Sequence, residues 1–314
     1  MYYFVRKMVG ITYHKIKENF MDRVRESVNA DFAHKRGYIG SGITVAVMDT
    51  GIVYHPDFDN RVILFKDFTS RRTIAYDDNG HGTHVCGIIG GSGFVSRGKY
   101  MGMAPGAKLI MLKVLDKLGN GNTSQVLQAL QWIIENREKY RIRIVNISVG
   151  MLNSAKQEER NRLLEAVEEV WNHQIVVIVA AGNNGPAEGS VTIPGMCKTV
   201  ITVGSCDDDK KDIRHKGMVP GYSGRGPTEH CIVKPELVAP GTKIQSCSTN
   251  MSYETKSGTS MATPVVTGAV ALLLSRYPYL TPAQVKLRLY ETATDIGKDK
   301  NIQGWGKIDV QRLL

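Results

Sequence analysis

The sequence is poor in cysteine and contains no long apolar run. Its 314 residues include five cysteines, an odd number, and no Cys-x-x-Cys pair. We therefore expect free thiols in a reducing compartment, with neither a disulfide framework nor a zinc site. No uninterrupted apolar run reaches the roughly 18 residues that a membrane-spanning helix needs, so a membrane is not an expected partner.

The first 20 residues lack the unbroken hydrophobic stretch of a secretory signal. Arg6, Lys7 and His14 interrupt their apolar residues. Because a secretory signal needs a continuous apolar stretch behind its basic start, the sequence predicts a cytoplasmic protein.

The sequence also lacks a concentrated basic region, although its formal net charge is +10. Lysine and arginine are dispersed, with only short clusters such as Arg71-Arg72. Nucleic-acid binding favours a basic stripe interleaved with aromatic residues, so we do not expect a nucleic-acid partner. The sequence makes no prediction of the oligomeric state.

Stretches rich in valine and isoleucine alternate with helical patterns. The candidate strands are residues 42–51, 107–115, 141–150, 174–185 and 198–205. Such runs, without a polar residue at every second position, are typical of parallel strands buried on both faces. The candidate helices are residues 21–36, 123–140, 155–172, 260–277 and 281–294. The alternation predicts an α/β fold, with one doubly wound, mostly parallel sheet flanked by helices in a single domain.

Polar residues stand at the carboxyl ends of three of these stretches. They are Asp49, the segment 148–150 that contains Ser148, and the segment 182–184 that contains Asn183. In open parallel sheets, ligands bind beyond the carboxyl ends of the strands. These residues are therefore the first candidates for a functional site.

Asp49, His81 and Ser260 together fit nucleophilic catalysis. His81 lies between glycines at an expected helix start, and Ser260 lies at another. Alone, each residue also fits a structural role: a turn cap for Asp49, a polar surface residue for His81, a helix N-cap for Ser260. A serine hydroxyl becomes a nucleophile when an imidazole takes its proton, and a buried carboxylate holds that imidazole in place.

An oxyanion formed in such a reaction needs hydrogen-bond donors. The side-chain amide of Asn183, in "AAGNNG", is one candidate, and the backbone N–H of Ser260 is a second. Asn183 taken alone also fits a left-handed turn, because Asn-Gly pairs favour turns.

Four stretches resemble the signature regions of the subtilisin-like serine proteases. They are "VMDTGIVYHPDF", "NGHGTHVCG", "AAGNNGP" and "GTSMATPVVTG". The similarity extends over roughly residues 38–314 and is closest in character to intracellular, alkaline-type members. The resemblance implies a subtilisin-like three-layer fold and a serine endopeptidase that binds polypeptides in extended form.

The resemblance also assigns roles at individual positions. Asp49 orients His81, His81 acts as general base and then acid, Ser260 is the nucleophile and Asn183 the oxyanion donor. The remaining implied residues bind substrate: an edge segment of Ser148, Val149 and Gly150, an opposite wall with Gly119 and Gly121, and a pocket shaped by Ala181, Gly182 and Thr192.

Two positions depart from the family's pattern beside the implied pocket. Met151 stands where a second glycine is common, and Thr192 stands where a glycine is common. Both changes put in doubt the family's usual preference for large apolar residues before the cut, and the sequence leaves the preferred residue open. No acidic residue occurs among the implied pocket residues, so a strict requirement for lysine or arginine is not indicated.

The implied calcium loop also differs from the family's pattern. Many relatives bind calcium on an Asn-rich loop after the catalytic histidine, but residues 90–102 contain no Asp, Glu or Asn. Calcium prefers oxygen ligands that include carboxylates, so we expect no metal or other cofactor there. Another cation site remains open, although Asp207-Asp208-Asp209 is better explained as a solvated turn.

Residues 1–20 are expected to form a short N-terminal segment that modulates activity, ahead of a catalytic domain over residues 21–314. One alternative is a catalytically silent peptide-binding protein on the same fold. A second is nucleotide binding by "GFVSRGKY", which nearly matches a phosphate-binding loop but has Tyr100 in place of the Ser or Thr that holds magnesium.

Overall fold

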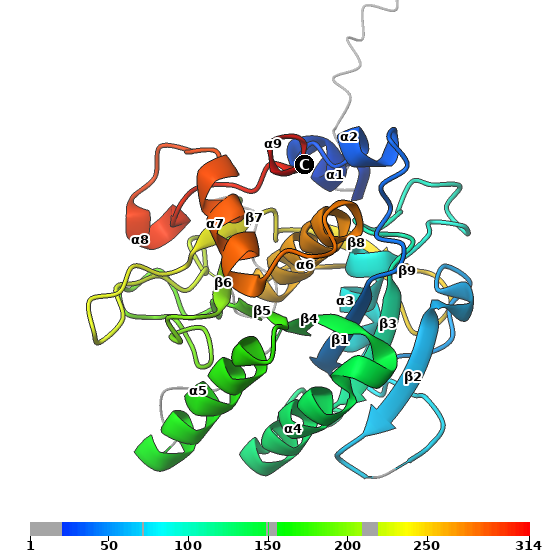
Figure 1. Cartoon of the computed structure of the whole chain (residues 1–314), viewed down its shortest axis with the longest axis horizontal. Coiled ribbons are helices and arrows are strands. Elements are labelled where there is room, and N and C mark those ends of the chain that lie inside the picture. The colour runs from blue at the N-terminus through cyan, green and yellow to red at the C-terminus, as the bar shows by residue number, and fades with distance from the viewer. Residues whose placement is uncertain (1–20, 71, 149, 151–155, 209–218) are drawn as a thin grey trace, which may run out of the picture.

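A computed structural model describes residues 21–70, 72–148, 150, 156–208 and 219–314 (Figure 1). A seven-stranded sheet forms its centre, in the order β2-β3-β1-β4-β5-β6-β7, and every neighbouring pair is parallel. The strands are β1 Thr44–Asp49, β2 Val62–Asp67, β3 Lys108–Lys113, β4 Ile142–Ile147, β5 Val176–Ala180, β6 Ile201–Ser205 and β7 Leu237–Ala239.

Helices cover both faces of this sheet and make three layers (Figure 1). One face packs against α3 (His81–Gly90) and α6 (Thr259–Arg276), and the other packs against α4 (Thr123–Tyr140) and α5 (Gln157–Asn172). The predicted doubly wound α/β fold is therefore confirmed.

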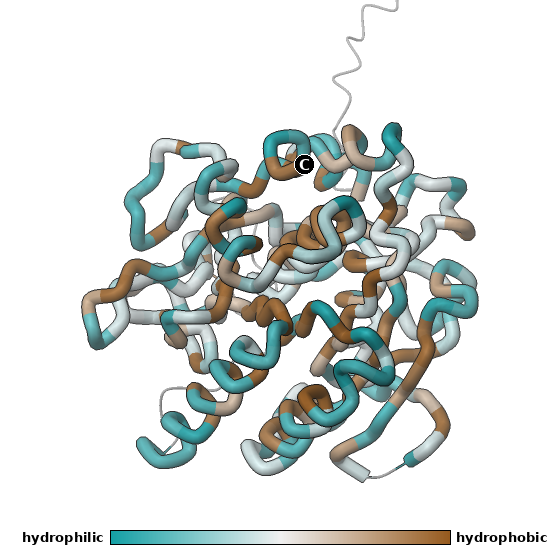
Figure 2. The backbone as a smooth tube through the Cα atoms, in the orientation of Figure 1, coloured by the Kyte–Doolittle hydropathy of each residue, from teal (hydrophilic) through white to brown (hydrophobic). Residues whose placement is uncertain are grey.

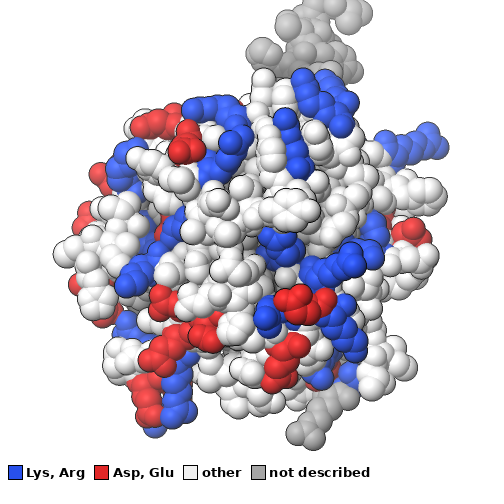
Figure 3. All heavy atoms as spheres, viewed as in Figure 1, with Lys and Arg blue, Asp and Glu red and all other residues white. Residues whose placement is uncertain are grey.

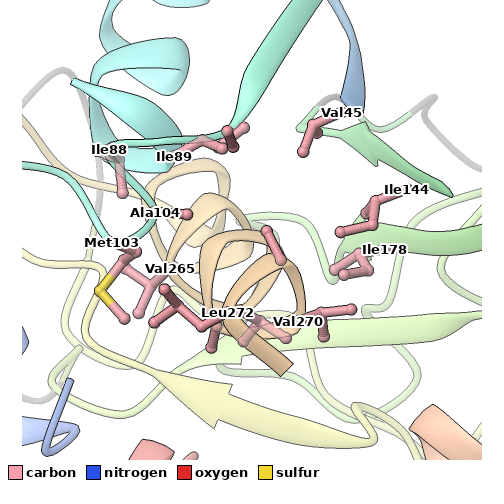
Figure 4. Close-up of a cluster of buried hydrophobic side chains, with 14 of the residues drawn as sticks. Val45, Ile88, Ile89, Met103, Ala104, Ile144, Ile178, Val265, Val270 and Leu272 are labelled. Atoms are coloured by element: carbon pink, nitrogen blue, oxygen red, sulfur yellow. The ribbon is translucent and has the colours of Figure 1, made fainter. Parts of the chain in front are cut away.

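Alternate residues of the central strand face the two helix layers, because side chains along a strand point to opposite faces. Val45 and Val47 of β1 join the core beneath α3 and α6, whereas Ala46 and Met48 join the core beneath α4 and α5. Figure 4 shows the strand residues Val45, Ile144 and Ile178 in one cluster with Val265, Val270 and Leu272 of α6, and Ile178 lies nearest Val270 in this view. The sheet is thus buried on both sides, which explains its unbroken apolar strands.

The layers differ in how far their helices are buried. Helix α5 is largely hydrophilic in Figure 2, and its buried residues Leu163, Val167 and Val170 recur every three or four positions. Helix α6 is buried almost all round, from Met261 to Leu274. An amphipathic helix covers a surface, whereas an apolar helix lies in the core, so α6 is the central helix of the molecule.

The expected helix over residues 21–36 is instead two short helices. They are α1 (Met21–Ser27) and α2 (Asp31–His34), separated by a turn in which Asn29 has a φ of 55°. A residue in the left-handed conformation cannot continue a right-handed helix, so the first helix ends before Asn29. The remaining elements are η1 Asp59–Arg61, β8 Ile244–Cys247, β9 Tyr253–Lys256, α7 Pro282–Thr292, α8 Lys300–Gln303 and α9 Val310–Leu313.

The surface agrees with the dispersed charge of the sequence. On the face drawn in Figure 3, basic and acidic side chains are intermingled. Across the part of the chain that the structure describes, no helix combines the length and apolar character needed to cross a membrane.

Candidate active site

The predicted catalytic residues lie at the carboxyl edge of the sheet. Asp49 is the last residue of β1, His81 is the first residue of α3, and Ser260 is the second residue of α6. Ser148 directly follows β4, and Asn183 follows β5. Because these strands are parallel, their carboxyl ends share one edge, and residues distant in the sequence meet there.

Asp49 and His81 form a short hydrogen bond. His81 Nδ1 donates to Asp49 Oδ1 at 2.8 Å, and the backbone N–H of Thr50 donates to the same oxygen at 2.7 Å. The Asp49 side chain is fully buried, whereas 23% of the His81 side chain is exposed. With its proton on Nδ1, the neutral imidazole presents the lone pair of Nε2, the atom that can accept a proton from a serine.

The environment of His81 raises its pKa above the ordinary value. Burial acts most strongly and lowers the pKa, but the charge and hydrogen bond of Asp49 together outweigh it. A buried carboxylate favours the imidazolium form, so this pair can stabilise the cation that forms during proton transfer.

Asp77 fixes the start of α3 relative to the end of β1. Its Oδ2 accepts hydrogen bonds from the backbone N–H and hydroxyl of Thr83, at 2.9 and 2.7 Å. Its Oδ1 accepts from the Thr50 hydroxyl at 2.8 Å, and that hydroxyl in turn accepts from Gly82 N–H at 2.9 Å. Asp77 was not predicted as part of the site, because only the folded structure shows what its carboxylate contacts.

Gly82 lets α3 approach the end of β1 closely. A Cβ atom at Gly82 would lie 2.2 Å from the backbone oxygen of Gly51. Real Cβ atoms do not approach an oxygen so closely, so any larger residue would push His81 away from Asp49.

Ser260 is not the N-cap of its helix, so the structural role considered for this residue alone does not hold. Gly258 caps α6 with a φ of 145°, a conformation that glycine adopts without steric cost. The Ser260 hydroxyl donates to the Ser148 backbone oxygen at 2.7 Å. Since a side chain with this bond is not yet donating to an imidazole, the hydroxyl must rotate before it can react.

Asn183 is held by the residue before the serine. Its Oδ1 accepts hydrogen bonds from the backbone N–H of Thr259 at 2.9 Å and from the Thr259 hydroxyl at 3.1 Å. These two bonds fix the orientation of the amide group, and Asn183 is exposed. The Ser260 N–H lies in the first helical turn, where backbone donors have no intrahelical partner. Asn183 is thus hydrogen-bonded to the residue that directly precedes Ser260.

The structure brings three of the implied pocket residues into contact. A Cβ atom built on Gly150 or Gly182 would lie within 2.5 Å of the Thr192 hydroxyl oxygen. The Thr192 N–H also donates to the Ala181 oxygen at 2.9 Å. Thr192 thus occupies the space between the two glycines. Val149 and Met151, the other residues discussed at this wall, lie outside the described residues.

The implied opposite wall lies close to the loop that precedes His81. Asn79 Nδ2 donates to the Lys117 oxygen at 3.1 Å, and Gly121 forms a bridge with Leu115. Gly119 and Gly121 are both exposed. This arrangement leaves them free to contact a bound chain beside His81.

One group of buried metal-ligating side chains occurs among the described residues, His55, Asp57 and Cys247. Its lone pairs are already used: Asp57 accepts from Tyr253 Oη at 2.8 Å and Val95 N–H at 3.0 Å, and His55 Nδ1 accepts from Asp57 N–H at 3.1 Å. Internal donors satisfy this cluster, so it is a hydrogen-bonded network rather than a site that calls for a cation.

The acidic segment at residues 207–209 is not the solvated turn expected from the sequence. Asp207 accepts hydrogen bonds from Gly241 N–H at 2.8 Å and Thr242 N–H at 3.0 Å, and Asp208 is 1% exposed. Both carboxylates are structural, because buried acidic groups persist only where donors surround them. Asp209 lies outside the described residues.

The nucleotide-binding alternative lacks its structural context. Residues 93–100 follow helix α3 and form turns, in which Gly98 N–H donates to Gly93 O at 2.8 Å. A phosphate-binding loop instead connects a strand to the start of a helix.

A parallel α/β sheet with an Asp-bound imidazole and a serine at a helix start defines the class of the serine hydrolases. The chain belongs to the Subtilase family, whose model matches residues 40–306. This match confirms the resemblance drawn from the four sequence motifs, and it makes the protein a serine endopeptidase that acts on polypeptides.

Individual relatives agree with this assignment. The chain is 40% identical to serine protease AprX of Bacillus subtilis, over 94% of this chain and 71% of AprX. It is 33% identical to subtilisin DY of Bacillus licheniformis, over 90% of this chain and 95% of that protein. Among solved structures, a cold-adapted subtilisin-like serine proteinase matches with a TM-score of 0.71 and 30% identity, covering 87% of this chain and 90% of the other.

Proposed function

We propose that the protein cleaves peptide bonds with Asp49, His81 and Ser260 as its catalytic triad. The observation that carries the proposal is the 2.8 Å hydrogen bond between His81 Nδ1 and the buried Asp49 carboxylate. It leaves Nε2 as the base. The Ser260 hydroxyl turns from Ser148 O to Nε2, gives up its proton, and its Oγ attacks the substrate carbonyl carbon.

The developing oxyanion is stabilised by two donors, Asn183 Nδ2 and the Ser260 N–H. Because Thr259 holds the Asn183 amide in place, little reorganisation is needed when charge appears. His81 then transfers its proton to the leaving amine, and an acyl group remains on Ser260. Water attacks this ester with His81 again as base, which releases the second product and restores the serine.

The substrate lies in extended form between two walls. The segment of Ser148, Val149 and Gly150 pairs with its backbone, as an added strand does, and Gly119 and Gly121 form the opposite side. The residue before the cut enters the pocket shaped by Ala181, Gly182 and Thr192. Since the Thr192 side chain fills the space between Gly150 and Gly182, we propose a preference for small residues there.

The remaining parts of the proposal concern the domain bounds, the cellular location, the metal requirement and the partners of the protein. The catalytic domain spans residues 21–314, and residues 1–20, which lie outside the described residues, modulate its activity. The protein acts in the cytoplasm, needs no metal for the chemistry, and has neither nucleic acid nor membrane as a partner. Deletion of residues 1–20 tests whether this segment modulates activity. Unchanged folding yield and unchanged peptide hydrolysis in the deletion variant would contradict that role.

A fluorophosphonate probe separates the enzyme from a catalytically silent peptide-binding protein on the same fold. The probe forms a bond only with an activated serine, so we expect one label, on Ser260, and none on the Ser260→Ala variant. A folded protein that takes up no label contradicts the proposed triad. Cleavage-site profiling on a peptide library, with the same variant as control, then measures the pocket's preference.

A further inference from the structure

Three Asn-Gly pairs occur in the sequence, and all three lie beside the candidate active site. Asn79-Gly80 directly precedes His81, Asn184-Gly185 directly follows Asn183, and Asn120-Gly121 belongs to the implied opposite wall. An Asn-Gly pair can react with itself, because glycine has no Cβ atom to shield its backbone nitrogen from the asparagine side chain. The nitrogen must be free to attack, so the hydrogen bonds of the three glycines decide which pair reacts.

The glycine N–H is hydrogen-bonded in two of the three pairs. Gly80 N–H donates to Asp77 Oδ1 at 2.8 Å, and Gly185 N–H donates to Tyr222 O at 2.9 Å. Backbone also packs closely against Gly185, since a Cβ atom built on it would lie 2.3 Å from Gly221 O. Each of these two nitrogens has to break a hydrogen bond before it can attack, so the fold protects both pairs.

The third pair differs, because Gly121 N–H makes no hydrogen bond to another described residue. Gly121 forms an antiparallel bridge with Leu115, but the hydrogen bond of this bridge runs from Asp116 N–H to Asn120 O at 2.9 Å. Leu115 and Gly121 are thus a non-hydrogen-bonded pair, whose N–H groups are turned away from each other. The Asn120 side chain also has no hydrogen-bond partner among the described residues, and both residues of the pair are exposed.

The next asparagine along the chain, Asn122, is not equivalent to Asn120. Its Oδ1 accepts a hydrogen bond from Ser124 N–H at 2.8 Å and caps α4. The residue that follows it is Thr123, whose branched side chain restricts the approach to the backbone nitrogen. Asn120 is therefore the one asparagine of this loop that combines a free side chain with a following glycine.

We propose that Asn120-Gly121 is a self-modification site at which the folded protein loses ammonia. Gly121 N attacks Asn120 Cγ, a new C–N bond forms and the Cγ–Nδ2 bond breaks. Nδ2 leaves as ammonia with the proton that Gly121 N gives up. Water then opens the cyclic imide: opening at Cγ leaves an aspartate in place of Asn120, and opening at the main-chain carbonyl leaves an isoaspartate. Water is the only co-reactant.

The reaction adds a negative charge to the wall of the substrate cleft. Residues 116–122 carry one acidic residue, Asp116, and one basic residue, Lys117, so the modified loop has a net negative charge. This consequence rests on the proposed function, which places Gly119 and Gly121 beside the bound chain. A carboxylate between them attracts basic substrate side chains and repels acidic ones, so the preference of the enzyme shifts towards basic peptides as it ages.

Mass spectrometry of the full-length Ser260→Ala variant tests the modification without self-cleavage. The folded protein is incubated in mildly alkaline buffer and digested with trypsin, which places the three Asn-Gly pairs in separate peptides, residues 73–97, 118–137 and 163–198. Each event adds about 1 Da, because OH replaces NH2. We expect the gain in peptide 118–137, at Asn120, about tenfold or more faster than in the other two, the factor that one hydrogen bond contributes. No gain at Asn120, or equal gains at all three pairs, overturns the proposal.

The same incubation in guanidinium chloride tests whether the fold causes the selectivity. Unfolding removes the hydrogen bonds of Gly80 and Gly185, so we expect the three pairs to react at similar rates. Selectivity for Asn120 that persists in the unfolded chain contradicts the role assigned to these hydrogen bonds.

Variants locate the reaction and its effect. Asn120→Gln is expected to abolish the mass gain, because its longer side chain forms the ring far more slowly, and Asn136→Gln, in the same peptide, keeps it. In the active enzyme, Asn120→Asp reproduces the charge of the product. We expect the ratio of kcat/KM for peptides with lysine or glutamate before the cut to rise about 2–5-fold, the size of an exposed charge pair. Asn136→Asp adds the same charge on α4 and leaves the ratio unchanged.

The outcomes separate this proposal from the proposed function. An unchanged ratio in Asn120→Asp, with fluorophosphonate labelling of Ser260 intact, contradicts the effect on the substrate cleft. Loss of labelling in the unmodified protein contradicts the triad and leaves the mass gain at Asn120 unaffected.

Discussion

His81 Nδ1 lies 2.8 Å from Oδ1 of Asp49, and that carboxylate is completely buried beneath the first turn of α3. Its other oxygen, Oδ2, has no hydrogen-bond partner among the described residues. The carboxylate therefore depends on the imidazole and on Thr50 N–H for compensation, and it favours the imidazolium cation strongly. Both the orientation of the histidine and its basicity follow from this one contact.

Replacing Asp49 with asparagine tests the orientation. The amide has nearly the same shape, but it has no charge and it stabilises the wrong tautomer of His81. We expect kcat to fall about 10⁴-fold, the size known for this change in a trypsin-type triad, while KM changes little. Steady-state kinetics on a peptide amide measure both. A variant that folds and keeps a tenth of its kcat would exclude Asp49 from the proposed role.

The raised pKa of His81 sets the pH dependence. Only the neutral imidazole accepts a proton, so kcat/KM rises with pH through a midpoint above the ordinary value of 6.5. For stability the direction is opposite: the favourable Asp49–imidazolium interaction is fully present below the unfolded-state pKa and is lost as pH rises through the folded-state pKa. A profile from about pH 5 to about pH 9 measures the midpoint, and Asp49→Asn is expected to lower it.

Asn183→Ala tests the oxyanion donor. The substitution removes Nδ2. It also removes Oδ1, which accepts a hydrogen bond from the Thr259 N–H in the native structure. We expect kcat to fall by about 10²–10³ with little change in KM, a magnitude taken from subtilisin, a relative of this chain. Thr259→Ser serves as control, because it keeps the hydroxyl and the backbone donor. A loss confined to KM would contradict a role in the transition state.

Thr192→Gly tests the pocket. Removing the side chain opens the space between Gly150 and Gly182, so large apolar residues before the cut gain room. We expect kcat/KM for a phenylalanine substrate to rise by about 10-fold or more, with little change for an alanine substrate. Thr192→Ser, which keeps the hydroxyl, is the control for polarity. An equal change for both substrates would show that the pocket lies elsewhere.

A buried ammonium group makes a separate prediction about stability. Lys234 is 0% exposed, and its Nζ donates to Cys197 O at 2.6 Å and to both oxygens of Glu236. Lys234→Met leaves Glu236 with Lys286, so we expect a loss of about 3 kcal/mol, at the lower end for a broken buried pair. Tm then falls by roughly 6–12 °C. Calorimetry measures it, and Lys286→Met, at a more exposed site, should cost less.

The central part of the fold could be predicted because buried parallel strands produce valine and isoleucine runs. Strands β2 and β7 were missed for physical reasons. β2 is a half-exposed edge strand whose apolar run is only four residues long, and β7 is only three residues long. The hairpin of β8 and β9 was missed as well, since its residues are mostly polar. The turn at Asn29 divides a helix whose apolar period continues through it.

The candidate site could be predicted to the extent that its residues stand at strand ends and helix starts. Asp49, His81 and Ser260 meet that condition. The roles of Asp77 and Thr259 could not be predicted from the sequence. Asp77 acts through Thr50, which is 27 positions away, and Thr259 acts through Asn183, which is 76 positions away. Contacts of this kind depend on the folded arrangement and have no local pattern.

The position of α6 in the chain has a consequence for biosynthesis. All seven strands of the central sheet precede this helix, yet the helix fills the core on one of their faces. A ribosome that works from the N-terminus delivers the strands and α3 first, so that face is only partly covered until residues 259–276 emerge. The same helix carries Ser260 as its second residue. A growing chain therefore gains the proposed nucleophile only together with the helix that fills this core, and we expect it to have no peptidase activity before that point.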